Sequence, residues 1–421
     1  MDVYGGIADY SGSLVLELLI SESTHVSVQP TDDDLIKVVS IRQQQGQQEH
    51  QDGFDMQLAS IVGRSYKEVC EYFSKQEQHR WASYVIGVFV VLMHEKGIQF
   101  TRGAKILIQS CVPEGKGVSS SAALEVATMR AVCAAYDALV EQAELATLCQ
   151  LVEHRVANAP CGIMDQATVV HGRTNKLFAL ECQPAIQKGY IDIPHHKIKF
   201  WGIDSGVRHS VSAGSSYADV RTAAFMGLAI IAASKSHDAK EEYLANITPS
   251  EYTSRHRDDL PENMLGSEFL KTYGETSDPI TTVDPNKIYA VRQCTEHPIY
   301  ENYRAKLFSS LVEYISWKQD DEDTTARHSL GELMYQSHVS YSKCGLGSPE
   351  TDRLVELVRK EAAAQEQQSV LYGARITGGG SGGTVVVLGR SDEVGEEAIH
   401  HIAKTYFSET GHDPYIFSMD C

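Results

Sequence analysis

The stretch PEGKGVSSSAALEV, residues 113–126, decides how the rest of the chain is interpreted. An alternating apolar segment, residues 103–113, predicts a strand before it, and the Ala-rich residues that follow predict a long helix. Gly115 and Gly117 let the backbone between them close around an anion, and the first turn of a helix offers unpaired N–H groups and a positive dipole end. The stretch therefore predicts a phosphate-binding loop. The alternative is a serine-capped helix after an ordinary loop.

A second segment, EHRVANAPCGIMDQ (residues 153–166), carries two carboxylates twelve residues apart, Glu153 and Asp165. Glu153 falls in a predicted helix that breaks before Pro160, and the Pro-Cys-Gly turn allows the chain to fold Asp165 back toward it. One carboxylate would suit a metal ion and the other a proton transfer. The alternative is a pair of ordinary surface acids.

A third segment, TGGGSGG (residues 377–383), precedes TVVVLG, a β-branched run that predicts a strand. Its glycines match the dinucleotide-binding pattern, but that pattern must open a helix, so the match fails. Glycines here permit close approach of the backbone to a ligand or another loop; the alternative is a turn with a bulge. Phosphate binding, Mg²⁺ and a base are together the parts of a phosphoryl-transfer site.

Composition narrows the class of protein. The chain has 421 residues, of which 42% are hydrophobic, so it can bury a core, and its formal net charge is −19. That charge argues against a general binder of nucleic acid or anionic membranes, whose surface must be basic. We expect neither a membrane span nor a signal peptide. We do expect a cytoplasmic location, reduced cysteines, and a monomer rather than an oligomer.

Strands and helices mix without a steady βαβ rhythm, which predicts an α+β fold. The predicted strands include residues 13–20, 24–30 and 196–206, and the predicted helices include residues 81–97, 121–139 and 143–158. Three polar stretches, residues 41–53, 316–329 and 234–265, are expected to be solvated loops or insertions.

The three motifs resemble those of the GHMP kinases, the superfamily of galactokinase, homoserine kinase, mevalonate kinase and phosphomevalonate kinase. PEGKGVSSSAAL resembles its signature loop, CGIMDQ its catalytic-aspartate segment, and ITGGGSGGTVVV its third motif. WASYVIGV, GSSYADVR, HPIYENYRAKLF and GSPETDRLVELV resemble segments of galactokinase-like sugar kinases. The resemblance implies the GHMP kinase fold, with two mixed α/β domains, expected at residues 1–200 and 201–421, and the active site in the cleft between them.

The resemblance also implies roles for individual residues. Asp165 is implied to deprotonate or orient the anomeric hydroxyl of a sugar, and Ser121 and Glu153 to hold Mg²⁺. Asp9 is implied to hydrogen-bond ring hydroxyls, and Tyr217 to lie at the sugar. The residues implied on the ATP side are Trp81, Pro113, Gly115, Gly117, Ser119, Ser120 and Ser121, with Gly379 and Gly380 supporting the phosphate loop.

The first motif departs from the galactokinase pattern Gly-Glu-His-x-Asp-Tyr, because this chain reads GGIADY from Gly5 to Tyr10. The glutamate of that pattern is implied to reach the C6 hydroxymethyl group of galactose, which L-arabinose lacks. Gly6 would therefore remove a carboxylate that arabinose leaves unpaired, and we expect it to be a specificity mark.

The printed sequence also starts inside this motif, after the Pro-Gly-Arg segment that precedes it in the family. Its arginine is implied to stabilise the transferring phosphoryl group. We expect either that the chain is a fragment or has a misassigned start, or that this protein has lost a catalytic part.

Within the superfamily, GGIADYSGSLVLELLI, FWGIDSGVRHSV and CGLGS are most similar to the kinase domain of plant-type L-arabinokinases. The resemblance implies an ATP- and Mg²⁺-dependent sugar-1-kinase that converts L-arabinose to L-arabinose 1-phosphate. One alternative is a galactokinase or another kinase of galactose-like sugars. The alternative of another class is a non-catalytic sensor that binds sugar and ATP.

Overall fold

The computed structural model describes residues 1–42, 50–208, 215–234, 242–318, 324–364 and 369–418. The chain forms two compact units. Unit 1 contains Met1–Ser21, Gly115–Val118 and Gly172–Cys421, and unit 2 contains Glu22–Glu114 and Ser119–His171. Helices and sheets are mixed, so the α+β prediction is confirmed. The predicted division of the chain into two family domains at residue 200 stays a prediction. The compact units do not follow this division, because the chain passes between them more than once.

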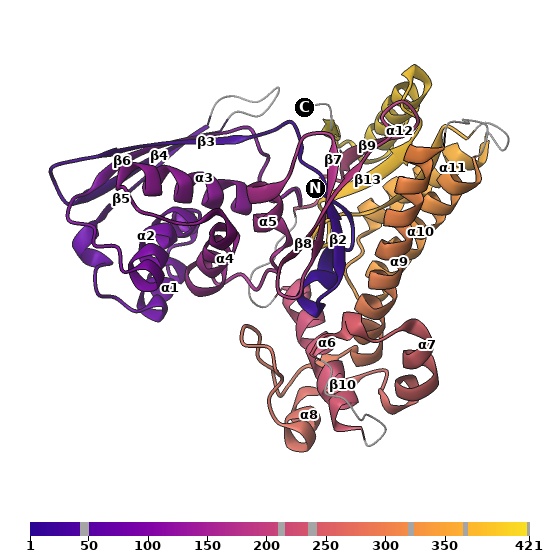
Figure 1. Cartoon of the computed structure of the whole chain (residues 1–421), viewed down its shortest axis with the longest axis horizontal. Helices are drawn as coiled ribbons and strands as arrows, with labels where there is room; N and C mark the ends of the chain where they lie inside the picture. The colour runs from indigo at the N-terminus through magenta and orange to yellow at the C-terminus, as the bar shows by residue number, and fades with distance from the viewer. Residues whose placement is uncertain (43–49, 209–214, 235–241, 319–323, 365–368, 419–421) are drawn as a thin grey trace. The chain divides into compact units, whose positions relative to one another are not determined.

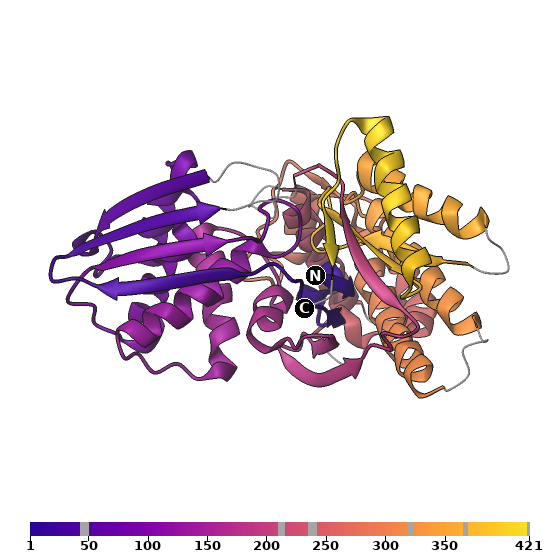
Figure 2. The same cartoon turned by 90° about the horizontal axis from the view of Figure 1, so that it is seen from above.

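Unit 2 is built on a four-stranded sheet with one face covered by helices (Figures 1 and 2). The strands, in sheet order, are β3 (Thr24–Pro30), β6 (Ala104–Ser110), β4 (Leu35–Arg42) and β5 (His50–Gln57), with β4 and β6 parallel and the other pairs antiparallel. In β6, Ile106 and Ile108 are buried whereas Lys105 and Leu107 are exposed. This period of two explains why helices pack on one face only.

The helices of unit 2 lie together beneath that face. They are α1 (Tyr66–Ser74), α2 (Ala82–Lys96), α3 (Ser120–Ala135), α4 (Gln142–Val152) and α5 (Met164–His171). α3 packs along β3 and contacts α2, α4 and α5. The buried, apolar α2 ends at Gly97, which adopts the left-handed conformation (φ 66°) that stops a helix.

Unit 1 contains two four-stranded sheets and a small two-stranded one. In sheet order the first comprises β1 (Asp2–Tyr4), β2 (Leu14–Glu17), β7 (Lys176–Glu181) and β8 (Ile186–Asp192), and the second β12 (Leu371–Ile376), β13 (Thr384–Gly389), β9 (Lys199–Asp204) and β14 (Ile416–Ser418). The small sheet pairs β10 (Met264–Leu265) with β11 (Ile288–Tyr289).

Helices cover both faces of the second sheet of unit 1. The helices of this unit are α6 (Ser216–Ala233), α7 (Pro249–Glu251), α8 (Gly266–Tyr273), α9 (Val291–Trp317), α10 (Thr325–Lys343), α11 (Pro349–Ala364) and α12 (Glu393–Thr410). Val386 and Leu388 of β13 pack in one core with α9, α10 and the first sheet, whereas Val385 and Val387 pack in another with α11 and α12. A strand buried on both faces reads as an unbroken apolar run, which is why TVVVLG was readable as a strand.

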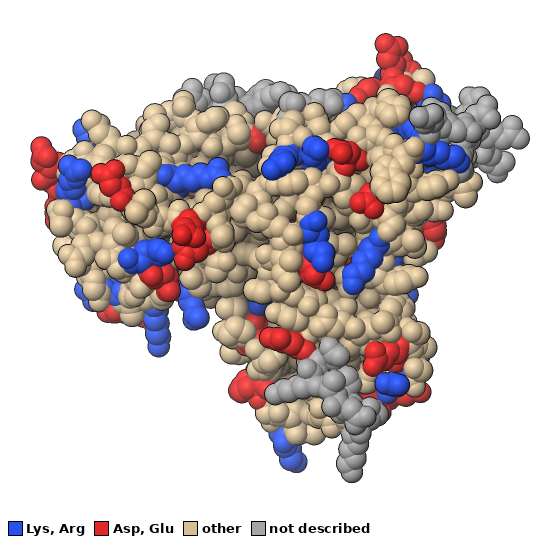
Figure 3. All heavy atoms as spheres, in the orientation of Figure 1, with Lys and Arg blue, Asp and Glu red and all other residues tan. Residues whose placement is uncertain are grey.

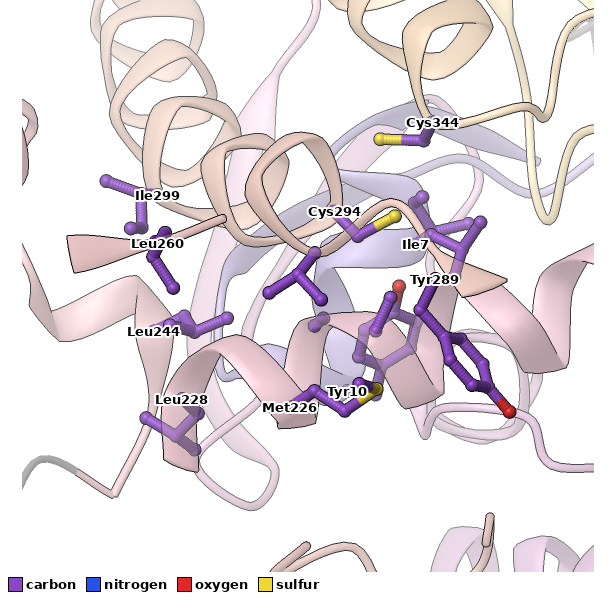
Figure 4. Close-up of a cluster of buried hydrophobic side chains, with 14 of the residues drawn as sticks. Ile7, Tyr10, Met226, Leu228, Leu244, Leu260, Tyr289, Cys294, Ile299 and Cys344 are labelled. Atoms are coloured by element: carbon purple, nitrogen blue, oxygen red, sulfur yellow. The ribbon is translucent and has the colours of Figure 1, made fainter. Parts of the chain in front are cut away.

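A third core of unit 1 surrounds α6 and the start of α9 (Figure 4). It joins Ile7 and Tyr10, from the N-terminal motif, to Met226 of α6 and Cys294 of α9. The N-terminal motif is therefore anchored in the interior of unit 1 rather than lying on its surface.

The predicted strands and helices are confirmed, but the three polar stretches are only partly loops. Residues 41–53 include the end of β4 and the start of β5. The start of β5 was predicted as a loop because an edge strand can be polar and still pair with its neighbour. Residues 316–329 include the start of α10, and within 234–265 both Tyr252 and His256 are buried. Residues 43–49, 235–241 and 319–323 of these stretches lie outside the described part of the chain.

The described surface carries mixed charge. On the face drawn in Figure 3, Lys and Arg side chains are scattered among Asp and Glu and do not gather into one basic patch. In the described ranges, every helix is too short or too polar to cross a membrane.

Candidate active site

The start of α3 brings the predicted serines and carboxylates of unit 2 together. Ser119 precedes the helix in a left-handed conformation (φ 62°), and its side chain does not cap the helix. Instead its hydroxyl donates a hydrogen bond to Asp165 Oδ1 at 2.5 Å. Asp165 lies in the first turn of α5 and stays partly exposed, so it can reach a substrate. Because Ser119 is bonded to Asp165, the first N–H groups of α3 do not receive the cap that a serine usually supplies.

Glu153 meets the same helix end through the third serine. The Ser121 hydroxyl donates to Glu153 Oε1 at 2.8 Å. Glu153 begins a π-helical turn (Glu153–Ala157) that continues α4 and ends at Asn158 in the left-handed conformation. Burial, together with the charge of Asp165, raises the pKa of the Glu153 carboxyl to about 7, although the Ser121 hydrogen bond opposes this. The predicted fold-back of the two carboxylates toward one place is therefore observed.

Two further residues of this cluster were not predicted. Gln166 Nε2 donates to Glu153 Oε1 at 3.1 Å and lies 3.4 Å from Glu125 Oε2, so it bridges the two glutamates. Glu125 is fully buried, and burial raises the pKa of its carboxyl well above the usual value, with the charge of Glu153 adding to the effect. The spacing held a signal: Glu125 lies four residues after Ser121, on the same face of α3, and Gln166 follows Asp165 directly.

The donor set suits a small hard cation. Among the described residues, Glu153 Oε2 and Glu125 Oε1 are buried oxygens without a hydrogen-bond partner. Hydroxyl and carboxylate oxygens are the ligands that Mg²⁺ prefers, and it binds through one or two carboxylates, with substrate phosphates and water completing the shell. In the described ranges, the protein does not gather three His, Cys, Asp or Glu side chains that could hold a metal ion without such help.

The glycines of the predicted phosphate loop belong to unit 1 and pack on the third motif. Gly115 and Gly117 both have positive φ (72° and 69°). A Cβ added to Gly378 would lie 3.1 Å from the Gly117 carbonyl oxygen, and one added to Gly383 would lie 3.0 Å from the Lys116 carbonyl oxygen. Side chains at either position would crowd the loop, so the glycines of the third motif permit this close approach.

Lys116, in the middle of that loop, is committed to a neighbour. Its ammonium group forms an ion pair with buried Asp204, which also lies 3.0 Å from His412 Nε2. The aliphatic stem of Arg208 lies 3.5 Å from where a Cβ of Gly115 would be. Arg208 is thus a second cation at the loop, which sequence reasoning missed because nothing in the pattern places it there.

The predicted sugar-contacting residues also belong to unit 1. Asp9 lies in a 3₁₀ turn (Gly6–Ser11), is almost fully buried, and accepts a hydrogen bond from the Tyr10 N–H at 2.6 Å. Tyr217, in the first turn of α6, packs edge-on against the Tyr10 ring at 5.9 Å between centroids. Arg221, one turn further along α6, is held by a two-pronged ion pair with Asp278 at 2.8 Å and lies 5.4 Å from the Tyr10 ring. Asp9 and Tyr217 are therefore both anchored through Tyr10.

Gly6 has a structural reason that the sequence did not reveal. Its φ is +45°, and a Cβ there would lie 1.7 Å from Tyr341 Oη and 2.8 Å from Asp2 Oδ2. The Tyr341 hydroxyl accepts from the Ile7 N–H at 2.9 Å and donates to the Gly378 carbonyl at 3.0 Å. A glutamate at position 6 would need this buried tyrosine to move, so packing favours glycine here; the role of Gly6 in the choice of sugar stays a prediction.

The predicted site residues fall into two groups, one in each unit. The group of unit 2 is Trp81, Pro113, Ser119, Ser120, Ser121, Glu153 and Asp165, and the group of unit 1 is Gly6, Asp9, Gly115, Gly117, Tyr217, Gly379 and Gly380. Trp81 directly precedes α2 and is partly exposed, and Pro113 is buried in the loop after β6. Their place at ATP stays a prediction, as does the joint action of the two groups.

The family models agree with this geometry. Residues 83–173 match the GHMP kinases N terminal domain, and residues 324–408 match the GHMP kinases C terminal domain. The first match contains Ser119, Ser121, Glu153 and Asp165, the residues that meet at the start of α3. The chain therefore carries both the N-terminal and the C-terminal domain of the GHMP kinases.

Relatives within the family include sugar kinases. The L-arabinokinase of Arabidopsis thaliana is 42% identical to this chain over an alignment of 469 positions. The alignment covers 99% of this chain and 44% of that protein. The chain therefore spans less than half the length of that relative. A galactokinase of Actinobacillus pleuropneumoniae serotype 3 is 28% identical over 417 residues, covering 98% of this chain and 88% of that protein.

Solved structures share the fold. A galactokinase of Lactococcus lactis, complexed with galactose, superposes with a TM-score of 0.72 at 20% identity and covers 99% of this chain and 90% of that one. A mevalonate kinase of Methanococcus jannaschii superposes with a TM-score of 0.55 at 16% identity, covering 99% and 94%. The predicted GHMP kinase fold is confirmed.

Proposed function

We propose that this protein is an ATP- and Mg²⁺-dependent sugar-1-kinase that phosphorylates the anomeric hydroxyl of L-arabinose. The observation that carries the proposal is the pairing of Ser119 with Asp165 and of Ser121 with Glu153 at the start of α3. The similarity to an L-arabinokinase along nearly the whole chain supports the choice of sugar.

In this proposal Asp165 is the base. Its Oδ1 is held by Ser119, which leaves Oδ2 available to accept a hydrogen bond from the sugar hydroxyl and orient it. Phosphoryl transfer needs little covalent help from the protein, so positioning this hydroxyl and stabilising the phosphates account for most of the catalysis.

Ser121 and Glu153 would hold Mg²⁺, which when bound neutralises charge on the ATP phosphates. Glu153 fits this role because its second oxygen is buried without a partner in the described residues. Gln166 and Ser121 fix the first oxygen, so the carboxylate is oriented before a ligand arrives. The uncapped N–H groups of α3 and the backbone of Gly115–Val118 would contact the phosphates.

Asp9 and Tyr217 would contact the sugar. Both contact Tyr10 in unit 1, Asp9 by a hydrogen bond from the Tyr10 N–H and Tyr217 through the Tyr10 ring. Trp81 would lie on the adenine side. A cytoplasmic monomer remains our expectation.

A galactokinase is the second candidate, favoured by relatives of 28% identity that align with 98% of this chain. A non-catalytic sensor of sugar and ATP is the candidate of another class. The Ser119–Asp165 and Ser121–Glu153 pairs argue against a sensor, because binding alone does not need a buried metal ligand and an oriented base.

A screen of ADP release by a coupled assay tests the proposal. We expect turnover with L-arabinose to exceed turnover with galactose, galacturonate, fucose and glucose. Turnover on galactose with none on L-arabinose would favour the galactokinase, and binding of sugar and ATP without ADP release would favour the sensor. Asp165→Ala should bind ATP but lose turnover, whereas Asp55→Ala, which removes an exposed aspartate of β5, should keep it.

A further inference from the structure

A groove of about 770 Å³ opens in unit 1 and shares no residue with the candidate active site. Its walls are stripes of two helices: on α9 the lining residues recur every three or four positions, as they do on α10. The lining also includes Arg257 and Arg359, which lie outside these two helices. Figure 1 shows α9, α10 and α11 in the same part of unit 1.

Cations outnumber acids in this groove, although the whole chain carries a net charge of −19. The lining holds four cations, Arg257, Arg304, Lys343 and Arg359, and two acids, Glu296 and Glu332. A positive hollow on an acidic protein is an electrostatic exception, since nearby acids would ordinarily neutralise it.

Two of the four cations are not committed to an acid. Arg257 pairs with Glu296 at 3.2 Å, and Arg304 pairs with buried Glu301 at 2.6 Å. Lys343 and Arg359 form no ion pair with an acid of the described residues. The guanidinium of Arg359 instead stacks on the Tyr335 ring, 4.3 Å from its centroid. Stacking fixes the plane of the guanidinium while leaving its N–H groups free to bind an anion.

Beside Tyr300, Tyr335 and Val339, part of the remaining lining is suited to hydroxyl groups. Gln293, Gln336 and Ser340 offer amide and hydroxyl donors and acceptors, and the Glu332 carboxylate accepts a hydrogen bond from Gln336. The volume exceeds what a phosphate ion alone would fill, so an organic part would fit beside it.

We propose that this groove is a second binding site, for a phosphate monoester of a small polyhydroxylated molecule. Lys343 and Arg359 bind the phosphate, whose tetrahedral oxygens accept hydrogen bonds from several directions, and the amide and carboxylate groups bind hydroxyls. A carboxylate ligand would use this arrangement less well, because its two oxygens lie in one plane. The proposal does not depend on the kinase activity.

The groove also has a route to the N-terminal motif. Arg304 lines it and binds Glu301, whose other oxygen accepts from Ser337 at 2.5 Å. Ser337 accepts from Arg375, and Arg375 binds Asp2 at 2.9 Å.

Asp2 in turn accepts from the Gly6 N–H at 3.1 Å and from the Gly378 N–H at 3.2 Å. These hydrogen bonds connect Arg304, which lines the groove, with Gly6 and Gly378 through buried charged groups.

Isothermal titration with glucose 1-phosphate, in saturating ADP and Mg²⁺, tests the site. The groove variant Lys343→Glu/Arg359→Glu is compared with Lys306→Glu/Lys404→Glu, which makes the same charge change at exposed lysines of α9 and α12 outside the groove. We expect the groove variant to lose one equivalent of binding, or to bind about tenfold more weakly, while wild type and control agree. Any binding at the phosphate loop is common to all three proteins.

Equal stoichiometry and affinity in all three proteins would overturn the proposal. Competition by L-glutamate as strong as that by inorganic phosphate would overturn the choice of phosphate, and equal binding of free glucose would show that charge is not what the groove recognises. If the charge-reversal variant fails to fold, Lys343→Gln/Arg359→Gln is used, and the same loss is expected.

Discussion

The contact between Gly6 and Tyr341 gives the sharpest prediction about the N-terminal motif. Replacing Gly6 by alanine places a Cβ 1.7 Å from Tyr341 Oη, far inside van der Waals contact, so the tyrosine must move. Its hydroxyl would then leave the Ile7 N–H and the Gly378 carbonyl without their partner, both in the interior.

The cost follows from these contacts. A buried polar group left without its hydrogen bond costs about 1–3 kcal/mol, and an alanine at φ +45° adds about 1 kcal/mol. We therefore expect Gly6→Ala to lower the free energy of unfolding by about 4 kcal/mol. Tyr341→Phe loses the same two hydrogen bonds without a clash and should cost about 2–3 kcal/mol.

A double-mutant cycle in urea measures the coupling. In Gly6→Ala/Tyr341→Phe the hydroxyl is absent. The remaining close contacts of the new Cβ are Asp2 Oδ2 at 2.8 Å and the ring atom Cζ at 3.0 Å, which small shifts relieve. The double variant should be about 2 kcal/mol more stable than the sum of the single effects predicts. Additive costs would refute the packing argument and return Gly6 to a role in sugar choice alone.

Three further outcomes are expected. Ser119→Ala should lower kcat roughly tenfold with a smaller change in KM for ATP, because Asp165 loses a charge-assisted hydrogen bond; steady-state kinetics measure it. Glu125→Gln should raise the Tm of the metal-free protein more at pH 8 than at pH 5, because the raised pKa of Glu125 means that its ionised form destabilises the fold as pH rises. Burial lowers the pKa of His297 to about 4, whereas the histidine of the unfolded chain takes up a proton below about pH 6.5. Lowering the pH from 7.5 to 5 should therefore reduce the free energy of unfolding by about 2 kcal/mol through this residue. His297→Gln should flatten this part of the pH profile, measured by urea unfolding.

Much of the fold was predictable because its elements carry strong local patterns. β13 is buried on both faces and therefore reads as an unbroken apolar run, and α2 is apolar throughout and ends in a glycine. β5 escaped prediction because an edge strand can be polar and still pair. The partition into units was out of reach, since it depends on contacts between segments hundreds of residues apart.

The residues of the candidate site can likewise be divided into those that the sequence predicted and those that it did not. Ser121, Glu153 and Asp165 were predicted from their residue types and spacing together with the resemblance to the GHMP kinases, and the structure brings them to one helix end. Gln166 and Glu125 were missed, because a bridging amide and a second buried glutamate have no motif of their own. The Tyr341 hydroxyl binds the N–H of Ile7, next to Gly6, across 334 residues of sequence, and no sequence pattern marks such a contact.

The most direct test of the account is to identify the product by ³¹P NMR after incubation with L-arabinose, ATP and Mg²⁺. We expect a phosphate monoester resonance coupled to the anomeric proton of the product with the wild-type protein and with Asp55→Ala, and none with Asp165→Ala. A phosphate ester at any other carbon, or the same product formed at the wild-type rate by Asp165→Ala, would contradict it.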